Sequence, residues 1–262
     1  MNIQVLMSTC NKNNIEELDL DNRNIKEECI IVNQMADKYK EEINSTIKMY
    51  SYPEKGLSKS RNRLIEHATG DIGIITDDDI SFFADYNKVL ENAYIKYPEA
   101  DIITFCTRKG NKVIGSKKTK KHDLYSIMAI ASFQISFRIS SIKKYNIKLD
   151  ELFGLGAKYK AGEENIFLYD CKKKRLNVIH IPEIINEHPD EETTGEKWDL
   201  DLIKAKGAFS YRILGKFHFL FLVYFIIFKY KFYKNVVSIR KFITTYMSGI
   251  KEYKRYIKEI TC

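Results

Sequence analysis

The chain has 262 residues, 44% of them hydrophobic, which is enough for one large α/β domain with an appendage or for two small domains. The net charge of +8 belongs to the C-terminal segment, because residues 216–262 hold ten Lys and Arg and two Glu while the rest of the chain is balanced. A neutral main domain gives no support for nucleic-acid binding. The five cysteines are scattered and never paired as C-x-x-C, which argues against a disulfide framework or a zinc site.

Alternating strand and helix patterns fill the first hundred residues. Apolar, β-branched runs predict strands at 3–7, 29–33, 47–52, 72–76 and 102–106, and helices are predicted at 15–20, 58–68 and 85–96. Such alternation predicts an α/β fold with a mostly parallel sheet and helices on both faces. The N-terminus lacks the basic region and long apolar core of a signal peptide, so we expect a cytoplasmic protein.

Three adjacent carboxylates, Asp77, Asp78 and Asp79, follow the strand predicted at 72–76. They repel one another unless a cation or a donor neutralises them. Successive side chains of an extended chain point to opposite sides, so Asp77 and Asp79 share a face. Two carboxylates on one face at the end of a strand suit a hard divalent cation that also holds phosphate oxygens. The alternative is an acidic turn, since Asp is common in turns.

The segment 107–160 is less regular. The basic run 117–121 predicts a solvated loop, and 127–138 is a candidate for a pair of strands across the site. The glycine-rich stretch 153–157 lacks the Gly-Lys-Ser/Thr ending of a P-loop. We interpret it as a substrate-side loop that needs a close approach of the backbone.

Two acidic residues, Glu163 and Glu164, open a predicted helix that continues over 166–171. Acids in a first helical turn also suit the helix dipole, so a structural role is the alternative. A strand predicted at 177–185 is followed by His188. A histidine just beyond a strand end, in a chain with a carboxylate site, is a candidate metal ligand, although histidines near proline turns are commonly structural.

An apolar, aromatic segment and a basic helix are predicted at the C-terminus. Residues 217–228 are too few to span a bilayer, which needs about 20. Lys216 and Lys229 flank them, which suits a helix lying in a membrane interface. The alternative is a buried helix packed on the main domain. We divide the chain into a domain over 1–210 and an aromatic, basic helical segment over 211–262.

One apolar stripe runs along the last predicted helix. Its members recur at steps of four and three: Ile239, Ile243, Tyr246, Ile250, Tyr253, Ile257 and Ile260. The stripe predicts a helix that docks on the domain, pairs with a second copy as a homodimer, or lies on anionic lipid. The basic residues beside an aromatic helix favour lipid, at the inner face of the cytoplasmic membrane.

Four short stretches occur in the order found in one enzyme family. They are Ser8, Thr9, Cys10 and Asn11 after the first strand, the run 56–62 at a helix start, Thr76 to Asp79, and Gly162 to Asn165. With these stretches, residues 1 to about 190 resemble a glycosyltransferase of the GT-A fold, close to family 2. The resemblance implies a Rossmann-like, mostly parallel sheet with helices on both faces, to which the C-terminal amphipathic helices are added.

The resemblance also implies roles for site residues. The nucleotide sugar would be bound by Thr9, Asn11, Arg61, Asp77 and Asp78. A Mn²⁺ or Mg²⁺ ion would be held by Asp79, Asp77 and His188. Glu164 matches the second acid of the family's Glu-Asp pair, the general base, and Glu163 is the alternative because the family commonly has Asp at the second position.

The implied activity is inverting, metal-dependent transfer of a sugar from a nucleoside diphosphate, foremost UDP, to a hydroxyl of a glycan or lipid-linked acceptor in surface polysaccharide synthesis. Two other functions stay open. A sugar nucleotidyltransferase shares the sheet and the carboxylate-bound metal, but its glycine-rich and basic N-terminal signature is missing between Met7 and Lys26. A non-catalytic, membrane-docked scaffold would bind no nucleotide sugar in a metal-dependent way.

Overall fold

The computed structural model describes residues 1–190, 195 and 197–261. Its strands are β1 (Ile3–Cys10), β2 (Glu28–Gln34), β3 (Lys40–Asn44), β4 (Ile47–Ser51), β5 (Ile72–Asp77), β6 (Ser81–Phe82), β7 (Ile102–Lys109), β8 (Lys112–Ile114), β9 (Lys120–Lys121), β10 (Ile135–Arg138) and β11 (Val178–His188). Its α-helices are α1 (Leu57–His67), α2 (Tyr86–Lys96), α3 (Ile139–Lys144), α4 (Glu163–Lys173), α5 (Leu200–Leu214), α6 (Phe219–Phe228), α7 (Tyr230–Tyr233) and α8 (Ile239–Thr261). Short 3₁₀ turns are η1 (Ile15–Leu18), η2 (Ser126–Ala129), η3 (Ser132–Gln134) and η4 (Gly215–Phe217).

The strands form one sheet in the order β3-β4-β2-β1-β5-β10-β7-β11-β6, with β8 beside β7 and β9 beside β11. β4, β2, β1 and β5 run parallel, as do β7 and β11, while β10 is antiparallel to both of its neighbours. The predicted α/β fold with a parallel sheet is therefore confirmed. The five strands predicted up to residue 106 are present, and the short strands β3, β6, β8 and β9, each antiparallel to a neighbour, were not predicted.

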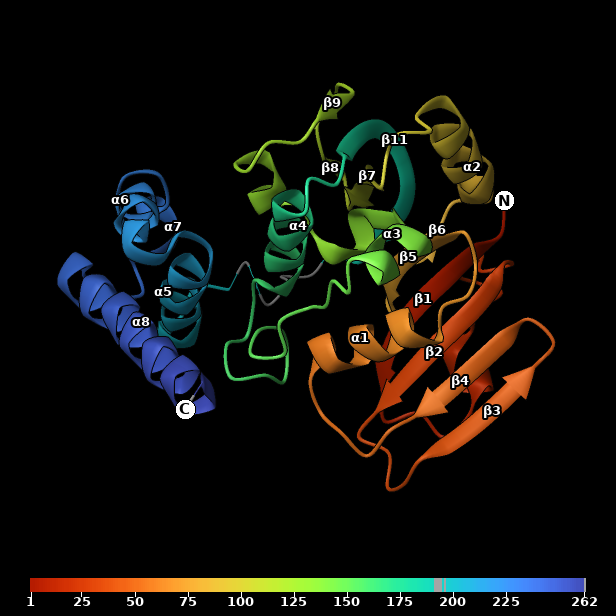
Figure 1. The fold of residues 1–262 in the computed structure, drawn as a ribbon, viewed down its shortest axis with the longest axis horizontal. Coiled ribbons are helices and arrows are strands. Elements are labelled where there is room, and N and C mark those ends of the chain that lie inside the picture. The colour runs from red at the N-terminus through yellow and green to blue at the C-terminus, as the bar shows by residue number, and fades with distance from the viewer. Residues whose placement is uncertain (191–194, 196, 262) are drawn as a thin grey trace.

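Two apolar cores lie on opposite faces of the sheet. One is closed by α1, α3 and α4, with Leu64, Ile142 and Phe167 among its buried members. The other is closed by η1 and α2, with Leu18 and Leu90 among its members. Figure 1 shows α1 and α2 on separate sides of the strands, and this agrees with the predicted covering of both faces.

Three local predictions were wrong. The helix expected at 15–20 is the single turn η1, because Asn14 caps it and Asp19 takes a left-handed φ of 50° that ends it. The pair of strands expected at 127–138 is replaced by η2, η3 and the single strand β10, because the Gln134 side chain accepts from the Ala131 amide and closes a turn. The basic run at 117–121 is not all loop, since β9 pairs with β11.

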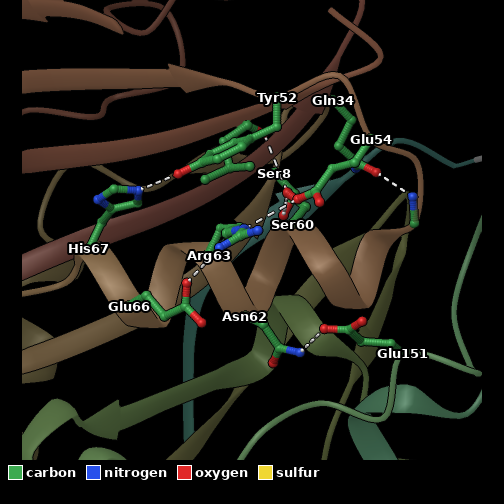
Figure 2. Close-up of polar contacts among 12 residues, drawn as sticks. Ser8, Gln34, Tyr52, Glu54, Ser60, Asn62, Arg63, Glu66, His67 and Glu151 are labelled. Atoms are coloured by element: carbon green, nitrogen blue, oxygen red, sulfur yellow. Dashed lines mark hydrogen bonds and ion pairs between the residues drawn. The ribbon is translucent and has the colours of Figure 1, made fainter. Parts of the chain in front are cut away.

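Helix α1 is fixed at both ends by polar contacts that Figure 2 shows. Ser60 near its start donates to Ser8 Oγ at 3.0 Å, and the Tyr52 hydroxyl lies 2.8 Å from His67 Nε2 at its end. Asn62 donates to Glu151 at 3.1 Å. Because these contacts join α1 to β1, to the residue after β4 and to the segment between α3 and α4, the position of α1 at the edge of the sheet is fixed.

The C-terminal helices α5 to α8 form a group beside α4, drawn in blue in Figure 1. Helix α8 packs on α5, with the stripe residues Tyr246, Ile250 and Tyr253 buried together with Phe242, which lies outside the predicted stripe. Helix α8 therefore docks on α5 of the same chain, and pairing with a second copy or binding of lipid stays a prediction. Ile239 and Ile257 are exposed, and the side chain of Ile260 lies outside the described part.

Helix α6 is apolar on every side but is not a buried helix. Phe225 is its one residue classed as buried, whereas Ile227 and Phe228 are each 63% exposed. One side of α6 thus packs on the rest of the chain through Phe225, while the other side is exposed, and its position in a membrane interface stays a prediction. Within the described residues, no helix is long and apolar enough to cross a bilayer.

Candidate active site

The register of β1 and β5 brings two of the sequence motifs together. Ser8 pairs with Asp77 in parallel register, so Thr9 near the end of β1 and Asp78 just after β5 lie side by side. The Thr9 hydroxyl donates to Asp78 Oδ2 at 2.5 Å. The carboxyl ends of these two central strands therefore form one polar floor, as expected for a parallel sheet.

A cavity of about 400 Å³ opens above this floor. It is lined by Ser8, Thr9, Cys10, Gln34, Leu57, Arg61, Asp77, Asp78, Asp79, Ala131, Ser132, Phe133, Leu155, Lys160, Ala161, Glu163, Glu164, His188 and Gly195. The aspartate trio and the acidic pair of α4, about eighty-five residues apart in the chain, thus face one space. Leu155 of the glycine-rich loop also lines it, and its carbonyl accepts from the Leu57 amide at the start of α1.

Arg61 joins the two acidic motifs beneath the cavity. It is 1% exposed, and its Nη1 donates to Glu163 Oε1 at 3.0 Å while its Nη2 donates to Asp77 Oδ1 at 2.9 Å. The same Nη2 also donates to Ser132 Oγ at 2.8 Å. An arginine shared between two carboxylates compensates their charge in a place that is poorly solvated. Its predicted contact with the nucleotide stays a prediction.

The two glutamates of α4 have different surroundings. Glu163 is buried against Arg61, whereas Glu164 is half-buried, lines the cavity and has no such partner among the described residues. Removal from water, followed by the neighbouring charge of Glu163, raises the pKa of Glu164 to about 8, against smaller opposing effects that include Arg61 and Lys206. A carboxyl that titrates near neutral pH can take up a proton during a reaction.

Asp79 and His188 meet at the other side of the cavity. Antiparallel pairing of β6 with β11 sets Glu187 opposite Ser81, which carries His188 toward the aspartate trio. His188 Nε2 lies 3.8 Å from Asp79 Oδ2, and the imidazole rests on the Phe133 ring. Burial and the charge of Asp77 raise the pKa of Asp79, while His188 opposes the shift.

These two side chains suit a divalent metal ion. The Nδ1 of His188 lies 2.6 Å from the Pro189 carbonyl oxygen, which accepts only, so Nδ1 donates there and Nε2, the nitrogen that faces Asp79, is the one that would bind a metal ion. Among the described residues no cluster of three or more His, Cys, Asp or Glu has the arrangement of a metal site. Diphosphate oxygens and water would therefore have to complete the coordination, as is common for Mg²⁺ and Mn²⁺.

The remaining predicted residues are placed as follows. Asp77 accepts with both oxygens from Arg61, so as it stands it is an ion-pair partner. Asn11 is exposed and does not line the cavity, and its backbone takes a left-handed φ of 56°. Ser132 and Lys160 also line the cavity, and sequence reasoning missed them. Both lie in segments whose sequence has no strand or helix periodicity. Lys160 Nζ donates to Asp199 Oδ2 at 2.5 Å.

The sequence profile of glycosyl transferase family 2 matches residues 5–161, which include the polar floor and the trio but end just before Glu163. The chain belongs to glycosyl transferase family 2. The fold of this family 2 chain is of the GT-A type, in agreement with the resemblance drawn from its motifs. A sequence search of curated proteins finds no match.

Solved structures of S. aureus TarS share this fold. TarS 1–349 in complex with UDP-GlcNAc has 12% identity and a TM-score of 0.65, and the match covers 95% of this chain and 82% of that chain. The complex of TarS 1–349 with UDP gives 13% identity and a TM-score of 0.63, with 95% and 81% covered. A further crystal structure of S. aureus TarS has 15% identity and a TM-score of 0.61. That match covers 95% of the family 2 chain but 49% of the TarS chain.

Proposed function

We propose that this family 2 chain transfers a sugar from a nucleoside diphosphate to an acceptor hydroxyl with inversion at the anomeric carbon. The observation that carries the proposal is the shared cavity, in which Glu164 faces the aspartate trio. The UDP-sugar complex of TarS supports a UDP-sugar as the donor. Family membership also favours sugar transfer over nucleotidyl transfer, which would release pyrophosphate instead of nucleoside diphosphate.

The roles of the residues follow from their positions. Asp79 and His188 would hold a Mn²⁺ or Mg²⁺ ion, which supplies Lewis-acid stabilisation of the departing diphosphate when bound. Glu164 takes the proton of the acceptor hydroxyl while the hydroxyl oxygen bonds to the anomeric carbon. The bond between the anomeric carbon and the diphosphate oxygen breaks in the same step. A base on the side opposite the leaving group gives inversion. Arg61 keeps Asp77 and Glu163 in place from below.

The acceptor is proposed to lie at a membrane surface. Exposed apolar residues of α6 stand beside basic residues, with Phe219, Leu220, Val223, Ile227 and Phe228 on the outside and Lys216, Lys231 and Lys234 exposed nearby. Apolar insertion combined with attraction to anionic lipid is the usual basis of interfacial binding. A glycan or lipid-linked acceptor presented at this surface would reach the cavity beside α5.

A thermal-shift screen tests the donor proposal. With UDP-sugars and Mn²⁺, a ligand at one hundred times its Kd adds about 2.7 kcal/mol of stability. That corresponds to a rise in Tm of roughly 5–10 °C for a chain of this size. The shift should require both metal and nucleotide sugar, should persist in Glu164→Gln and should shrink in Asp79→Asn. If no UDP-sugar raises Tm with metal, the transfer proposal is wrong and the scaffold alternative gains support.

A further inference from the structure

A second cavity, which we term the aromatic cavity, lies between the main domain and the C-terminal helices. It has a volume of about 540 Å³, within the range of small-molecule sites. Its apolar wall is made of rings from α5, α6 and α7 and from the single tryptophan of the chain: Trp198, Phe209, Phe221, Tyr224, Phe225 and Phe232. The size and apolar lining suit a hydrocarbon chain.

Three cations also line the aromatic cavity, Lys120, Lys206 and Lys229. Within the described part of the chain none of them forms an ion pair with a carboxylate. Lys229 Nζ instead lies 5.4 Å from the Phe232 ring centre and 5.8 Å from that of Tyr224, and Lys206 Nζ lies 5.7 Å from that of Phe209. Lysines that line an aromatic cavity without a carboxylate in ion-pair contact favour an anionic ligand, and this holds most clearly for Lys120 and Lys229, because Lys206 also lies near Glu164.

The aromatic cavity adjoins the reaction cavity. Gly195 lines both, and Asn165, the residue after Glu164, lines the aromatic cavity. Lys206 is close enough to Glu164 for the two charges to affect each other's pKa. A ligand in the aromatic cavity would therefore have one end next to the proposed base.

Helix α6 connects the aromatic cavity with the outside. Phe221, Tyr224 and Phe225 face the cavity, while Ile227 and Phe228 of the same helix are exposed. An amphiphile that leaves a bilayer could thus move along an apolar surface from one side of α6 to the other. This continuity favours a lipid over a water-soluble anion as the occupant.

We propose that the aromatic cavity binds a lipid phosphate, with the hydrocarbon chain among the rings and the phosphate on Lys229, Lys120 and Lys206. It is the site for a lipid-phosphate-linked acceptor whose sugar hydroxyl extends past Asn165 to Glu164. The binding step is independent of the proposed function, and only the role as acceptor rests on it.

The single tryptophan gives a direct readout, because Trp198 lines the cavity. The full chain is titrated with decyl phosphate below its micelle concentration, with decanol and with inorganic phosphate, while Trp198 emission is recorded. We expect a saturable change with decyl phosphate, about tenfold weaker binding of decanol because charge-assisted contacts are lost, and no response to inorganic phosphate. Equal affinity for decanol and decyl phosphate, or no saturable change, would overturn the inference.

Matched variants locate the site. Lys229→Gln should weaken decyl phosphate binding about tenfold and leave decanol binding unchanged, because it removes one charge-assisted contact. Lys251→Gln on α8 removes the same charge from an exposed position outside this cavity and should change neither. Ala129→Phe fills part of the cavity and should weaken both probes. Equal losses in Lys229→Gln and Lys251→Gln would overturn the assignment of the phosphate.

The probe titration needs no donor, so the two proposals fail separately. A chain that binds decyl phosphate but shows no thermal shift with any UDP-sugar contradicts the proposed function and supports the lipid site. A chain that shows the donor shift but no Trp198 response contradicts the lipid site alone.

Discussion

At the scale of residues, the main contrast is between two neighbouring glutamates. Glu163 is buried in an ion pair with Arg61, while Glu164 lines the cavity with a pKa of about 8. Neighbours along the chain thus acquire different chemistry because α4 turns them to different sides. The acidic pair and Arg61 could each be found in the sequence, but the ion pair of Arg61 with Glu163 could not, since the two residues lie about one hundred positions apart.

The first prediction concerns pH. Only the carboxylate of Glu164 can accept a proton, so kcat/KM should rise with pH and level off above about 8, the pKa of the free enzyme. Glu164→Gln should lower the transfer rate by roughly 10²–10⁴-fold, and its remaining kcat/KM should no longer rise with pH. Initial rates of nucleoside diphosphate release over pH 5 to 9 measure both. Near wild-type transfer by Glu164→Gln would show that another group is the base.

Stability gives an independent check of the same group. The folded-state pKa of Glu164 is raised above its ordinary value of 4.5, so its contribution to stability is fully present below that value and is lost as pH rises through about 8. Glu164→Gln keeps a neutral side chain at every pH. Urea unfolding should therefore show the native chain losing stability relative to Glu164→Gln between pH 5 and 8. A difference independent of pH would contradict the shifted pKa.

The metal preference is a further prediction at this scale. Imidazole nitrogen suits Mn²⁺ better than the harder Mg²⁺, so His188 should make Mn²⁺ the more effective ion in donor binding. The measurement is the rise in Tm that UDP causes in the presence of Mn²⁺ and in the presence of Mg²⁺. In His188→Asn the difference between these two rises in Tm should be smaller than in the native chain. A larger shift with Mg²⁺ than with Mn²⁺ in the native chain would place His188 outside the metal site.

At the scale of elements, the contact between α5 and α8 depends on two glycines. A Cβ added to Gly249 would lie 2.0 Å from the Lys204 carbonyl oxygen, and one added to Gly207 would lie 2.0 Å from that of Tyr246. Neither glycine has a left-handed φ, so glycine is required at these positions because the two helix backbones approach closely. The sequence predicted the stripe of α8 but not its partner, because periodicity identifies an apolar face without identifying what covers it.

The prediction at this scale concerns substitution at the crossing of α5 and α8. In an exposed helix Gly→Ala stabilises by up to about 1 kcal/mol, but here Gly249→Ala should lower the free energy of unfolding by about 1–3 kcal/mol because the backbones must separate. Its neighbour Ser248 is exposed, so Ser248→Ala is the matched control and should leave stability unchanged or slightly raised. Chemical denaturation of the two variants measures the difference. A stabilised Gly249→Ala would mean that α8 is not docked as described.

At the scale of the whole molecule, charge and apolar surface are concentrated at one end. The main domain is neutral, while the segment 216–262 carries the net charge of +8 together with the exposed face of α6. This asymmetry could be predicted from composition, as could the α/β class from the alternation of patterns. The antiparallel strand β6 could not, because two residues are too few for a periodic signal, and of the pair of strands expected at 127–138 only β10 is present.

Membrane association is the prediction that belongs to this scale. The full chain should float with anionic vesicles, and less so with neutral vesicles or at high salt, because the lysines contribute through a screened attraction. Ile227→Ser should weaken binding about tenfold or more, as expected for losing one buried apolar side chain. Ile95→Ser on α2 is the control, since Ile95 is 65% exposed against 63% for Ile227. Equal effects of the two changes would contradict insertion of α6.

The most direct test is a crystal structure of the chain with UDP and Mn²⁺. We expect the diphosphate above the ends of β1 and β5, the metal in contact with Asp79 and His188, and the Glu164 carboxylate across the space that the sugar would occupy. Nucleotide bound elsewhere, or Glu164 turned away from the β-phosphate, would contradict the account.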